Sequence, residues 1–543
     1  MEGPAASPPA RKQTLKTGAT IRLEIPPETN SATQSAEPGP ALRWELALLA
    51  VLLLLAASSR AWLLGHTEVA ARDSVGFIRY ALELERDPWK EVLRRNLQHP
   101  GYPIVLLTVS WPVRYFLGGT NAVSMQLSAQ LASALAGVLL VIPMYFLGRD
   151  LFGRRVGFWG TALFQCLPVS ARVMSDALSE ATFLLFTATA LLLAVRALRS
   201  YSVTGFALCG LFSGLAYWTR PEGALIAVAA GLVLVAMPFV AAGPQLWRRV
   251  LGCGIALLLV ATVVSSPYAL ITGRLTNKPT PRKLWETAVS AERSQNPGPL
   301  TASVLASYAP ENLQDRHWWG LYAIATEVIK DFQYLSVLPL LLGMWWFRNR
   351  LKSGGGIWVL LVLCALHFLI LWRLAVVVGY VSDRHVLVLV LCGVYLVAGG
   401  VLAISECITL MDRRRLSLML FLVLIGLGLV EALKPLHANR IGHRQAGLWL
   451  AEHTELADPI VDPFCWAHYY AGRVFWEGRT PPAPPGYVPT QYVVLERSPS
   501  SDHSRLPTID HAKALAARGR LIYRWPVEKT EAEAKILVFA VRP

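Results

Sequence analysis

Acidic, basic and imidazole side chains gather in a polar stretch that follows the first long apolar segment of the chain. It contains Asp73 within Ala71-Arg72-Asp73-Ser74, and then His99 and Tyr102 within Gln98-His99-Pro100-Gly101-Tyr102-Pro103. Ionisable groups are costly to hold against hydrocarbon, so those kept beside a membrane commonly line a reaction or transport path. A carboxylate here can act as a general base toward a hydroxyl or amine, or bind a divalent cation, and the sequence leaves both roles open.

Further charged residues lie beside later apolar segments. Asp176 and Glu180 are four residues apart, which predicts that they share one helix face at the start of a span. Arg220 and Glu222 occupy one tight turn, and Arg384 occupies another. Guanidinium and imidazole groups suit a phosphate leaving group. The candidate phosphate ligands are His99, Arg172, Arg220 and Arg384. The candidate acceptor-binding or supporting residues are Tyr102, Glu180 and Glu222.

Each of these groups also has a purely structural explanation. Asp73 can form a solvated salt bridge with Arg72 or Arg79, and the His-Pro-Gly-Tyr-Pro element can simply open an aromatic-anchored helix. Carboxylates in the first turn of a helix are stabilised by the helix dipole. Glu180 would lie one turn into the membrane, so it needs a partner such as Arg172. The two turns can be self-paired surface turns.

The composition indicates a polytopic membrane protein. Of the 543 residues, 54% are hydrophobic and only 16% are charged, and the mean hydropathy is +0.42. The net charge of +15 would suggest nucleic acid in a soluble chain. Many of the basic residues lie in short connectors between apolar runs, where they hold loops in the cytoplasm and favour anionic headgroups. We therefore expect membrane lipids as partners and no nucleic acid.

Apolar runs predict about eleven transmembrane helices. The expected spans are 44–64, 121–147, 157–170, 177–197, 204–219, 223–242, 250–271, 333–347, 357–378, 385–405 and 416–432. The apolar segment 102–117 contains Pro103, Pro112 and Arg114, so we expect an interfacial helix there. With this arrangement the arginine-rich connectors and the basic N-terminal tail share one side, which the positive-inside rule assigns to the cytoplasm. The Asp73 stretch and the C-terminus are then extracytoplasmic.

We expect an all-α polytopic membrane protein with a small C-terminal α/β domain. Residues 1–43 are rich in Pro, Ser, Ala and Thr and predict a disordered cytoplasmic tail, too long and polar to open a signal peptide. Residues 44–432 form the transmembrane domain, and 433–543 form the soluble domain. Its helices are expected at 445–453 and 512–518, and its strands at 459–461, 492–495, 521–523 and 536–539. A long external loop, 272–332, includes an amphipathic helix through Ile324 and Val328.

Motifs of several other enzyme classes do not occur in the sequence: there is no phosphate-binding loop, no dinucleotide fingerprint, no His-Glu-x-x-His and no Gly-x-Ser-x-Gly, so nucleotide-driven cytoplasmic chemistry is not expected. Other short motifs follow one another in a distinctive order. They are Arg72-Asp73-Ser74 after the first span, His99-Pro100-Gly101-Tyr102-Pro103, Gly148-Arg149-Asp150-Leu151-Phe152-Gly153-Arg154-Arg155, Ser175-Asp176-Ala177-Leu178-Ser179-Glu180, and Trp218-Thr219-Arg220-Pro221-Glu222-Gly223. Their order resembles that in the GT-C superfamily of integral-membrane glycosyltransferases, in the branch of protein O-mannosyltransferases and bacterial aminoarabinose transferases.

The resemblance implies a glycosyltransferase of the bacterial cytoplasmic membrane. It would move a monosaccharide from a polyprenyl-phosphate donor to a protein, lipid or glycan acceptor on the outer face, with inversion. By this resemblance Asp73 is the catalytic base or positions the acceptor, and Asp176 is the acid at the head of the fourth span. Many relatives carry a second acid beside the first, where this chain has Ser74, so a metal site of two adjacent acids is not predicted. Whether a divalent cation is needed stays open.

Two other functions fit parts of the sequence. A transporter or flippase of lipid-linked sugars would also be polytopic, but it favours broken spans and internal repeats, whereas the ionisable groups here lie in connectors. A non-catalytic cell-envelope protein would act through residues 433–543.

Overall fold

The computed structural model describes residues 39–240, 244–279, 313–353, 355–408, 412–497 and 506–542. Residues Ala47–Pro543 form one compact unit. Of the tail expected at 1–43, residues 1–38 lie outside the described residues, and the last few begin the first helix.

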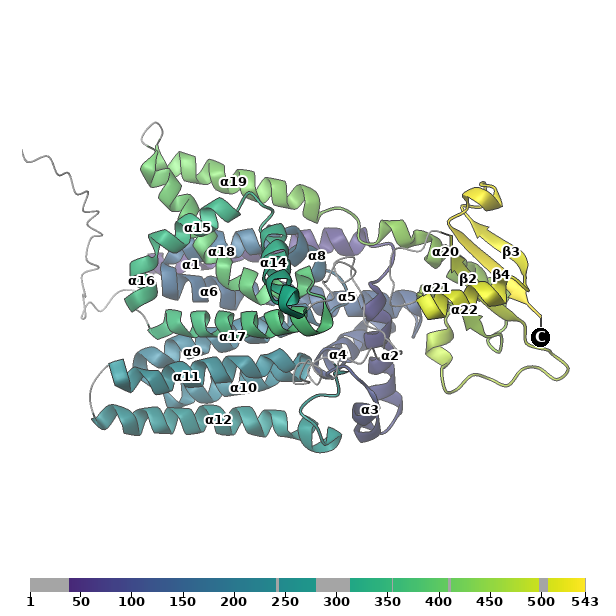
Figure 1. The fold of residues 1–543 in the computed structure, drawn as a ribbon, viewed down its shortest axis with the longest axis horizontal. Helices are drawn as coiled ribbons and strands as arrows, with labels where there is room; N and C mark the ends of the chain where they lie inside the picture. The colour runs from purple at the N-terminus through teal and green to yellow at the C-terminus, as the bar shows by residue number, and fades with distance from the viewer. Residues whose placement is uncertain are drawn as a thin grey trace, which may run out of the picture. The chain divides into compact units, whose positions relative to one another are not determined.

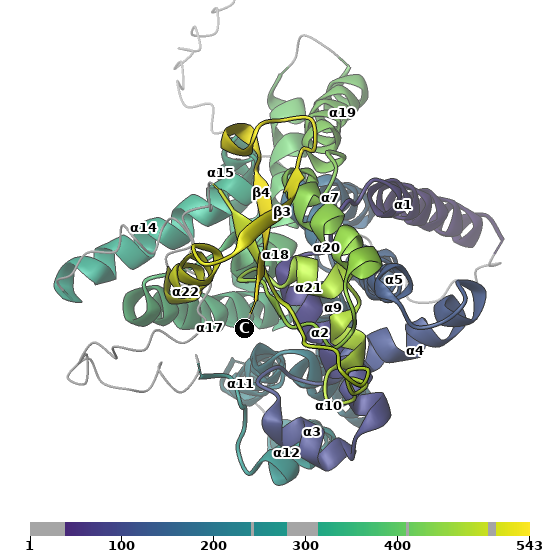
Figure 2. The ribbon, with the colours of Figure 1, turned by 90° about the vertical axis from the view of Figure 1, so that its right-hand side faces the viewer.

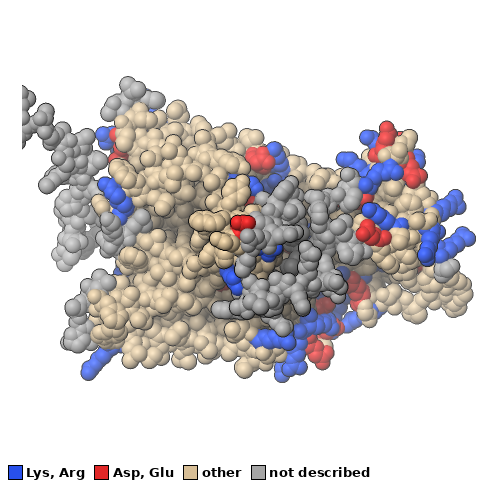
Figure 3. Space-filling model, viewed as in Figure 1, with Lys and Arg blue, Asp and Glu red and all other residues tan. Residues whose placement is uncertain are grey.

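Eight apolar helices in the described part of the chain are long enough to cross a membrane, so the protein is a multi-pass membrane protein. They are α1 (Gly39–Gly65), α5 with α6 (Ala122–Leu139 and Val141–Phe152), α9 (Glu180–Ser200), α11 (Ala224–Val240), α12 (Pro244–Thr272), α17 (Gly355–Val378), α18 (Asp383–Cys407) and α19 (Arg413–Ala432). Several of the long helices run side by side, and few charged side chains lie on the face that they present (Figure 1, Figure 3).

The other three expected spans are shorter helices. They are α7 (Arg154–Cys166) and the apolar helices α10 (Val203–Thr219) and α15 (Val337–Trp346). α7 ends because Pro168 follows Leu167, and a residue before proline is driven out of the helical region; Leu167 has ψ 134°. After α7 the chain continues as the short helix α8 (Pro168–Val173). After α15 it continues as the short helix α16 (Arg348–Ser353). Where eleven spans are expected, the described residues therefore contain eight apolar helices long enough to span and two shorter apolar helices.

Short helices lie beside the long ones. α2 (Arg72–Arg86) and α3 (Trp89–Arg95) precede α4 (Gly101–Phe116), which occupies the segment where an interfacial helix is expected. Trp111, Tyr115 and Phe116 of α4 are exposed, as suits an aromatic belt at a membrane surface. The amphipathic helix expected in the long loop is α14 (Leu313–Asp331), which buries Ile324 and exposes Trp318; residues 280–312 of that loop lie outside the described residues.

The C-terminal part holds a four-stranded sheet in the order β1-β2-β4-β3. The strands are β1 (Ile460–Val461), β2 (Gln491–Glu496), β3 (Arg520–Trp525) and β4 (Ile536–Val541), and only β1 and β2 are parallel. The neighbours Val493 and Val494 point to opposite faces. Val494 packs under α20 (Ile441–His453), and Val493 packs under α22 (Leu506–Ala516). All six elements expected here are confirmed.

A shared core joins the C-terminal part to the short helices. Phe464, Trp466 and Tyr469 pack in one buried cluster with Val75 and Ile78 of α2. Trp466 and Tyr469 belong to α21 (Trp466–Tyr470), which lies beside α2 (Figure 2). The C-terminal part is therefore packed against the segment that carries Asp73.

Two of the arginine-rich connectors meet at the same end of the helices. Arg149, near the end of α6, and Arg196, near the end of α9, both pair with Asp150, at 3.0 and 2.8 Å. This is the grouping that the charge pattern predicts for connectors on one side of a membrane.

Candidate active site

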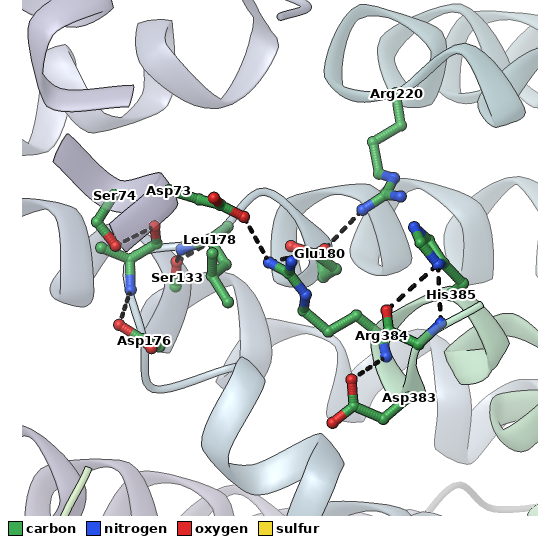
Figure 4. Close-up of polar contacts among 12 residues, drawn as sticks. Asp73, Ser74, Ser133, Asp176, Leu178, Glu180, Arg220, Asp383, Arg384 and His385 are labelled. Atoms are coloured by element: carbon green, nitrogen blue, oxygen red, sulfur yellow. Dashed lines mark hydrogen bonds and ion pairs between the residues drawn. The ribbon is translucent and has the colours of Figure 1, made fainter. Parts of the chain in front are cut away.

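Asp73 lies in the first turn of α2 and faces a residue from a distant part of the sequence. Its Oδ2 accepts a hydrogen bond from Arg384 Nη1 at 3.0 Å (Figure 4). Arg79, one of the local partners considered for Asp73, pairs with Glu477 instead. Asp73 therefore has an ionic partner from α18, a helix far from it in the sequence.

The ion pair of Asp73 is one end of a row of alternating charges. Arg384 also approaches Glu180 Oε1 at 3.9 Å, and Arg220 donates to the same oxygen at 2.6 Å. Arg220 lies 3.5 Å from Glu222. Glu180, buried at the start of α9, thus has its cationic partner, and that partner is Arg220 in place of the expected Arg172. Figure 4 shows Arg384 between Asp73 and Glu180.

Local sequence rules explain how these side chains are presented. Ser382 caps α18 in a reciprocal capping box with His385, which starts the helix so that Arg384 lies in its first turn. Glu180 is in the first turn of α9, where the helix dipole favours a carboxylate. Arg220 ends α10 in an extended conformation with φ −152° because Pro221 follows it. Three helix ends therefore converge on one row of charges.

A cavity of about 860 Å³ lies on the Asp73 side of the row, and we name it the polar cavity because many charged side chains line it among apolar ones. Its charged and titratable lining comes from α2, α8, α14, α18 and α19 and from the segments before α9 and after α19. Those residues are Arg72, Asp73, Arg172, Asp176, Lys330, Asp383, Arg384, Glu431 and His437.

An apolar cavity of about 1400 Å³ lies on the Glu180 side. Leucine, isoleucine and phenylalanine side chains of α9, α17 and α18 line much of it. Its polar lining residues are Glu180, Tyr217, Arg220, Glu222, Arg274, Thr276, Asn277, Lys278, His367, Arg373, Arg384 and His385. Arg384 lines both cavities, so the wall between them is made in part of the row of charges.

Lys278 is a cation of the apolar cavity that the sequence did not single out. Burial lowers the pKa of its ammonium to about 8, and neighbouring Arg220 adds to the shift. The side chain of Asn277 fixes the backbone beside it by donating to the carbonyl oxygens of Leu93 and Asn96, at 2.9 and 3.0 Å. Only a polar, proline-rich segment was visible in the sequence, because Lys278 acquires its surroundings from distant parts of the chain.

His99 is buried and lies behind this segment. Its Nε2 is 2.9 Å from Thr276 Oγ1, and its ring stacks at a tilt against Tyr268. Burial lowers the pKa of His99 to about 3, with the nearby Lys278 adding to the shift, so the ring is neutral at physiological pH. His99 lines neither cavity described here, and its contact with Thr276 places it two residues from Lys278.

Asp176 is buried in the turn before α9 and holds three groups. Its Oδ1 accepts hydrogen bonds from the amides of Ala71 and Ala177, at 3.1 and 2.8 Å, and its Oδ2 lies 2.7 Å from His437 Nε2. The expectation that Asp176 and Glu180 share a helix face is wrong, because α9 begins only at Glu180.

The remaining candidates have simpler surroundings. Tyr102 is fully buried, donates to the carbonyl of Ala129 at 2.8 Å, accepts from Ser133 at 3.1 Å, and lines neither cavity. Arg172 lines the polar cavity, on the other side of the row from Arg220. Among the described residues, no three His, Cys, Asp or Glu side chains are grouped as ligands of a metal ion.

Comparison with known proteins shows which fold this architecture shares. A sequence profile of the family described as dolichyl-phosphate-mannose-protein mannosyltransferase matches residues 110–271. No match was found among curated protein sequences. The structure is similar to ArnT from Cupriavidus metallidurans bound to undecaprenyl phosphate, with a TM-score of 0.55 and 15% identity over 92% of this chain and 98% of that one. It is also similar to the oligosaccharyltransferase of Archaeoglobus fulgidus in the apo form, with a TM-score of 0.52 and 13% identity over 79% of this chain and 64% of that one. The chain therefore has the fold of the GT-C integral-membrane glycosyltransferases.

Proposed function

We propose that the protein transfers a monosaccharide from a polyprenyl-phosphate carrier to an acceptor, with Asp73 as the general base. The observation that carries the proposal is the position of Asp73 and Arg384 at the wall between an apolar and a polar cavity. A lipid-linked sugar and its acceptor are chemically unlike, and two cavities that differ in polarity and share one wall suit such a pair.

The apolar cavity is the proposed donor site. Its leucine-rich lining suits a polyprenyl chain, and Lys278, Arg220 and Arg384 supply positive charge for a phosphate. Among the described residues no carboxylate forms an ion pair with Lys278 within 4 Å, so its ammonium is available to a ligand. We assign the phosphate contact first to Lys278 and Arg384, and we assign to His99 the support of the Lys278 segment. ArnT from Cupriavidus metallidurans, which has been solved with undecaprenyl phosphate, supports a donor of this class.

The reaction then needs only one displacement. The acceptor hydroxyl or amine enters from the polar cavity and gives its proton to the Asp73 carboxylate as it attacks C1 of the sugar. The new bond forms at C1 while the bond from C1 to the phosphate oxygen breaks, and the electron pair leaves with the lipid phosphate. Positive groups that neutralise this leaving group lower the barrier, and a single displacement inverts the anomeric centre.

The transporter alternative predicts ionisable groups midway along the spans. Asp73 lies in the first turn of α2, Arg220 at the end of α10 and Arg384 in the first turn of α18. This placement at helix ends supports chemistry at one membrane surface.

The decisive experiment measures turnover of undecaprenyl-phosphate sugars by the protein in nanodiscs. A panel of labelled donors carrying mannose, glucose, galactose or aminoarabinose is incubated with an extract of membranes and envelope proteins as acceptor. Asp73→Asn should abolish transfer. Asp87→Asn is the matched control, because Asp87 closes the same helix, is paired with Arg95 and has a side chain 35% exposed against 37% for Asp73. Retention of more than a tenth of wild-type turnover by Asp73→Asn would exclude the base role.

We also propose that α2, α4 and the C-terminal part face the extracytoplasmic side of a bacterial cytoplasmic membrane. In a background lacking the exposed native Cys407, single cysteines replace Leu117, after α4, and Arg155, in the first turn of α7. An impermeant thiol reagent applied to intact cells should label the first site and not the second. The opposite pattern would reverse the orientation.

A further inference from the structure

The helix that carries Asp73 lacks a local signal for where it begins. The N-cap residue of α2 is Ala71, which has no side-chain oxygen to accept a hydrogen bond from the first turn. Ser, Thr, Asp or Asn normally performs this function. The position of Asp73 therefore depends on what holds the residues just before it.

Residues from the C-terminal part hold the peptide groups at Ala70 from both sides. The Ala70 amide donates to the hydroxyl of Tyr470 at 3.2 Å, and the indole N–H of Trp466 donates to the Ala70 carbonyl at 2.9 Å. Tyr470 in turn donates to Gln126 Oε1 at 2.6 Å, which fixes its hydroxyl against α5. Ala70, Trp466 and Tyr470 are all buried, so water cannot replace these bonds at little cost.

A third contact reaches the next residue through Asp176. The Ala71 amide donates to Asp176 Oδ1, and His437 lies against Asp176 Oδ2. His437 has φ 51°, a left-handed conformation that is uncommon for residues with a side chain and that must be held by its surroundings. His437 also lies in the connection between α19 and α20, where the chain enters the C-terminal part.

We infer that the C-terminal part is a positioning element for the active site, with Trp466, Tyr470 and His437 as its positioning residues. They fix the peptide groups of Ala70 and Ala71, and these set the first turn of α2, in which Asp73 meets Arg384. The expected effect on transfer rests on the proposed role of Asp73 as base. The structural part of the inference, that these side chains set the beginning of α2, does not depend on that role.

The test compares Tyr470→Phe with Tyr469→Phe. Tyr469 is the neighbouring ring of the same buried cluster, but its hydroxyl donates to the carbonyl of Ala122, at 2.7 Å, and not to the Asp73 segment. Both variants remove one buried hydroxyl, so a general loss of packing affects both. Trp466→Phe and His437→Gln are the second and third variants of the positioning set.

Two readouts are taken from the full-length protein in nanodiscs. Hydrogen exchange of peptides covering residues 66–76 should be about fivefold faster in Tyr470→Phe and Trp466→Phe, the factor expected for one lost hydrogen bond, and unchanged in Tyr469→Phe. With undecaprenyl-phosphate sugars as donors, the same variants should lower kcat and leave the donor KM unchanged, since the apolar cavity contains none of these residues.

The outcomes separate the two proposals. Equal exchange of residues 66–76 in Tyr470→Phe, Trp466→Phe and wild type would overturn the positioning inference, whatever the activity. Faster exchange in a protein that turns over no donor in the panel would support the positioning and count against the proposed transfer. Faster exchange with an unchanged kcat would overturn the catalytic consequence.

Discussion

Arg384 Nη1 lies 3.0 Å from Asp73 Oδ2 and 3.9 Å from Glu180 Oε1, so one guanidinium joins a carboxylate of the polar cavity to a carboxylate of the apolar cavity. Asp73 and Arg384 are 311 positions apart in the sequence. The planar guanidinium of Arg384 carries several N–H donors in a fixed arrangement, so it can contact two carboxylates, and a phosphate after donor binding, from one position. A ligand phosphate in the apolar cavity would compete with Asp73 for Arg384, which would link donor binding to the release of the base.

The first prediction concerns the guanidinium of Arg384. Arg384→Lys keeps the positive charge but cannot contact both acids in the same way, and we expect kcat for transfer to fall about a hundredfold, as for loss of one preorganised donor. Arg79→Gln is the control, because it removes another arginine ion pair of α2, to Glu477. Steady-state turnover with the most active undecaprenyl-phosphate sugar is the measurement. Wild-type turnover in Arg384→Lys would show that a single charge is sufficient.

The second prediction concerns the buried pair of Glu180 and Arg220, whose side chains are only 7% and 11% exposed. Arg220→Gln leaves the Glu180 carboxylate without its nearest cation, and loss of one partner of a buried pair costs about 3 kcal/mol. The double variant Glu180→Gln with Arg220→Gln should be destabilised less than Arg220→Gln alone. Thermal unfolding in detergent measures both. If the two effects simply add, the carboxylate does not need this partner.

The third prediction follows from the lowered pKa of Lys278, about 8. Its ammonium is charged below that pH and loses its proton as the pH rises through it. If the charge holds the donor phosphate, affinity for undecaprenyl phosphate should fall about tenfold between pH 7 and pH 9. Lys278→Arg stays charged over this range, so its affinity should be nearly constant. Fluorescence titration at several pH values measures this, and parallel profiles for the two proteins would exclude the charge of Lys278 as the cause.

The fourth prediction concerns Asp331, at the end of α14, which is buried and whose two carboxyl oxygens have no partner among the described residues. Burial raises its pKa to about 9, with Asp383 and Glu327 adding to the shift. The folded protein therefore keeps a proton that the unfolded chain releases near pH 4, so this group opposes folding increasingly as the pH rises from 4 to 9. Asp331→Asn should raise the Tm at pH 7.5, and the gain should vanish toward pH 4.

Thermal unfolding at both pH values checks this fourth prediction. Asp315→Asn, at an exposed site in the first turn of the same helix, is the control and should leave the Tm unchanged at both. A Tm gain for Asp331→Asn that is the same at pH 4 and pH 7.5 would contradict the proposed protonation.

Much of the fold was predictable because apolar run length and local turn rules act over short stretches. The helix α4, the helix α14 and the strands around Val493 and Val538 all appear where the patterns predict them. The length of an apolar run does not predict where a helix ends. α7 is shorter than the expected span because Pro168 drives Leu167 out of the helical conformation. The start of α9 at Glu180 likewise separates it from Asp176, although their spacing suits one helix face.

The sequence by itself determined the membrane class of the protein and the presence of acids and arginines at helix ends, because hydropathy and helix boundaries are set by neighbouring residues. Only the tertiary structure decided which of these charges meet. Asp73 pairs with Arg384, and Glu180 pairs with Arg220, over distances in the chain that no local rule covers. Lys278 and His437 gained their importance in the same way, since burial and convergence are properties of the packed helices and not of any segment alone.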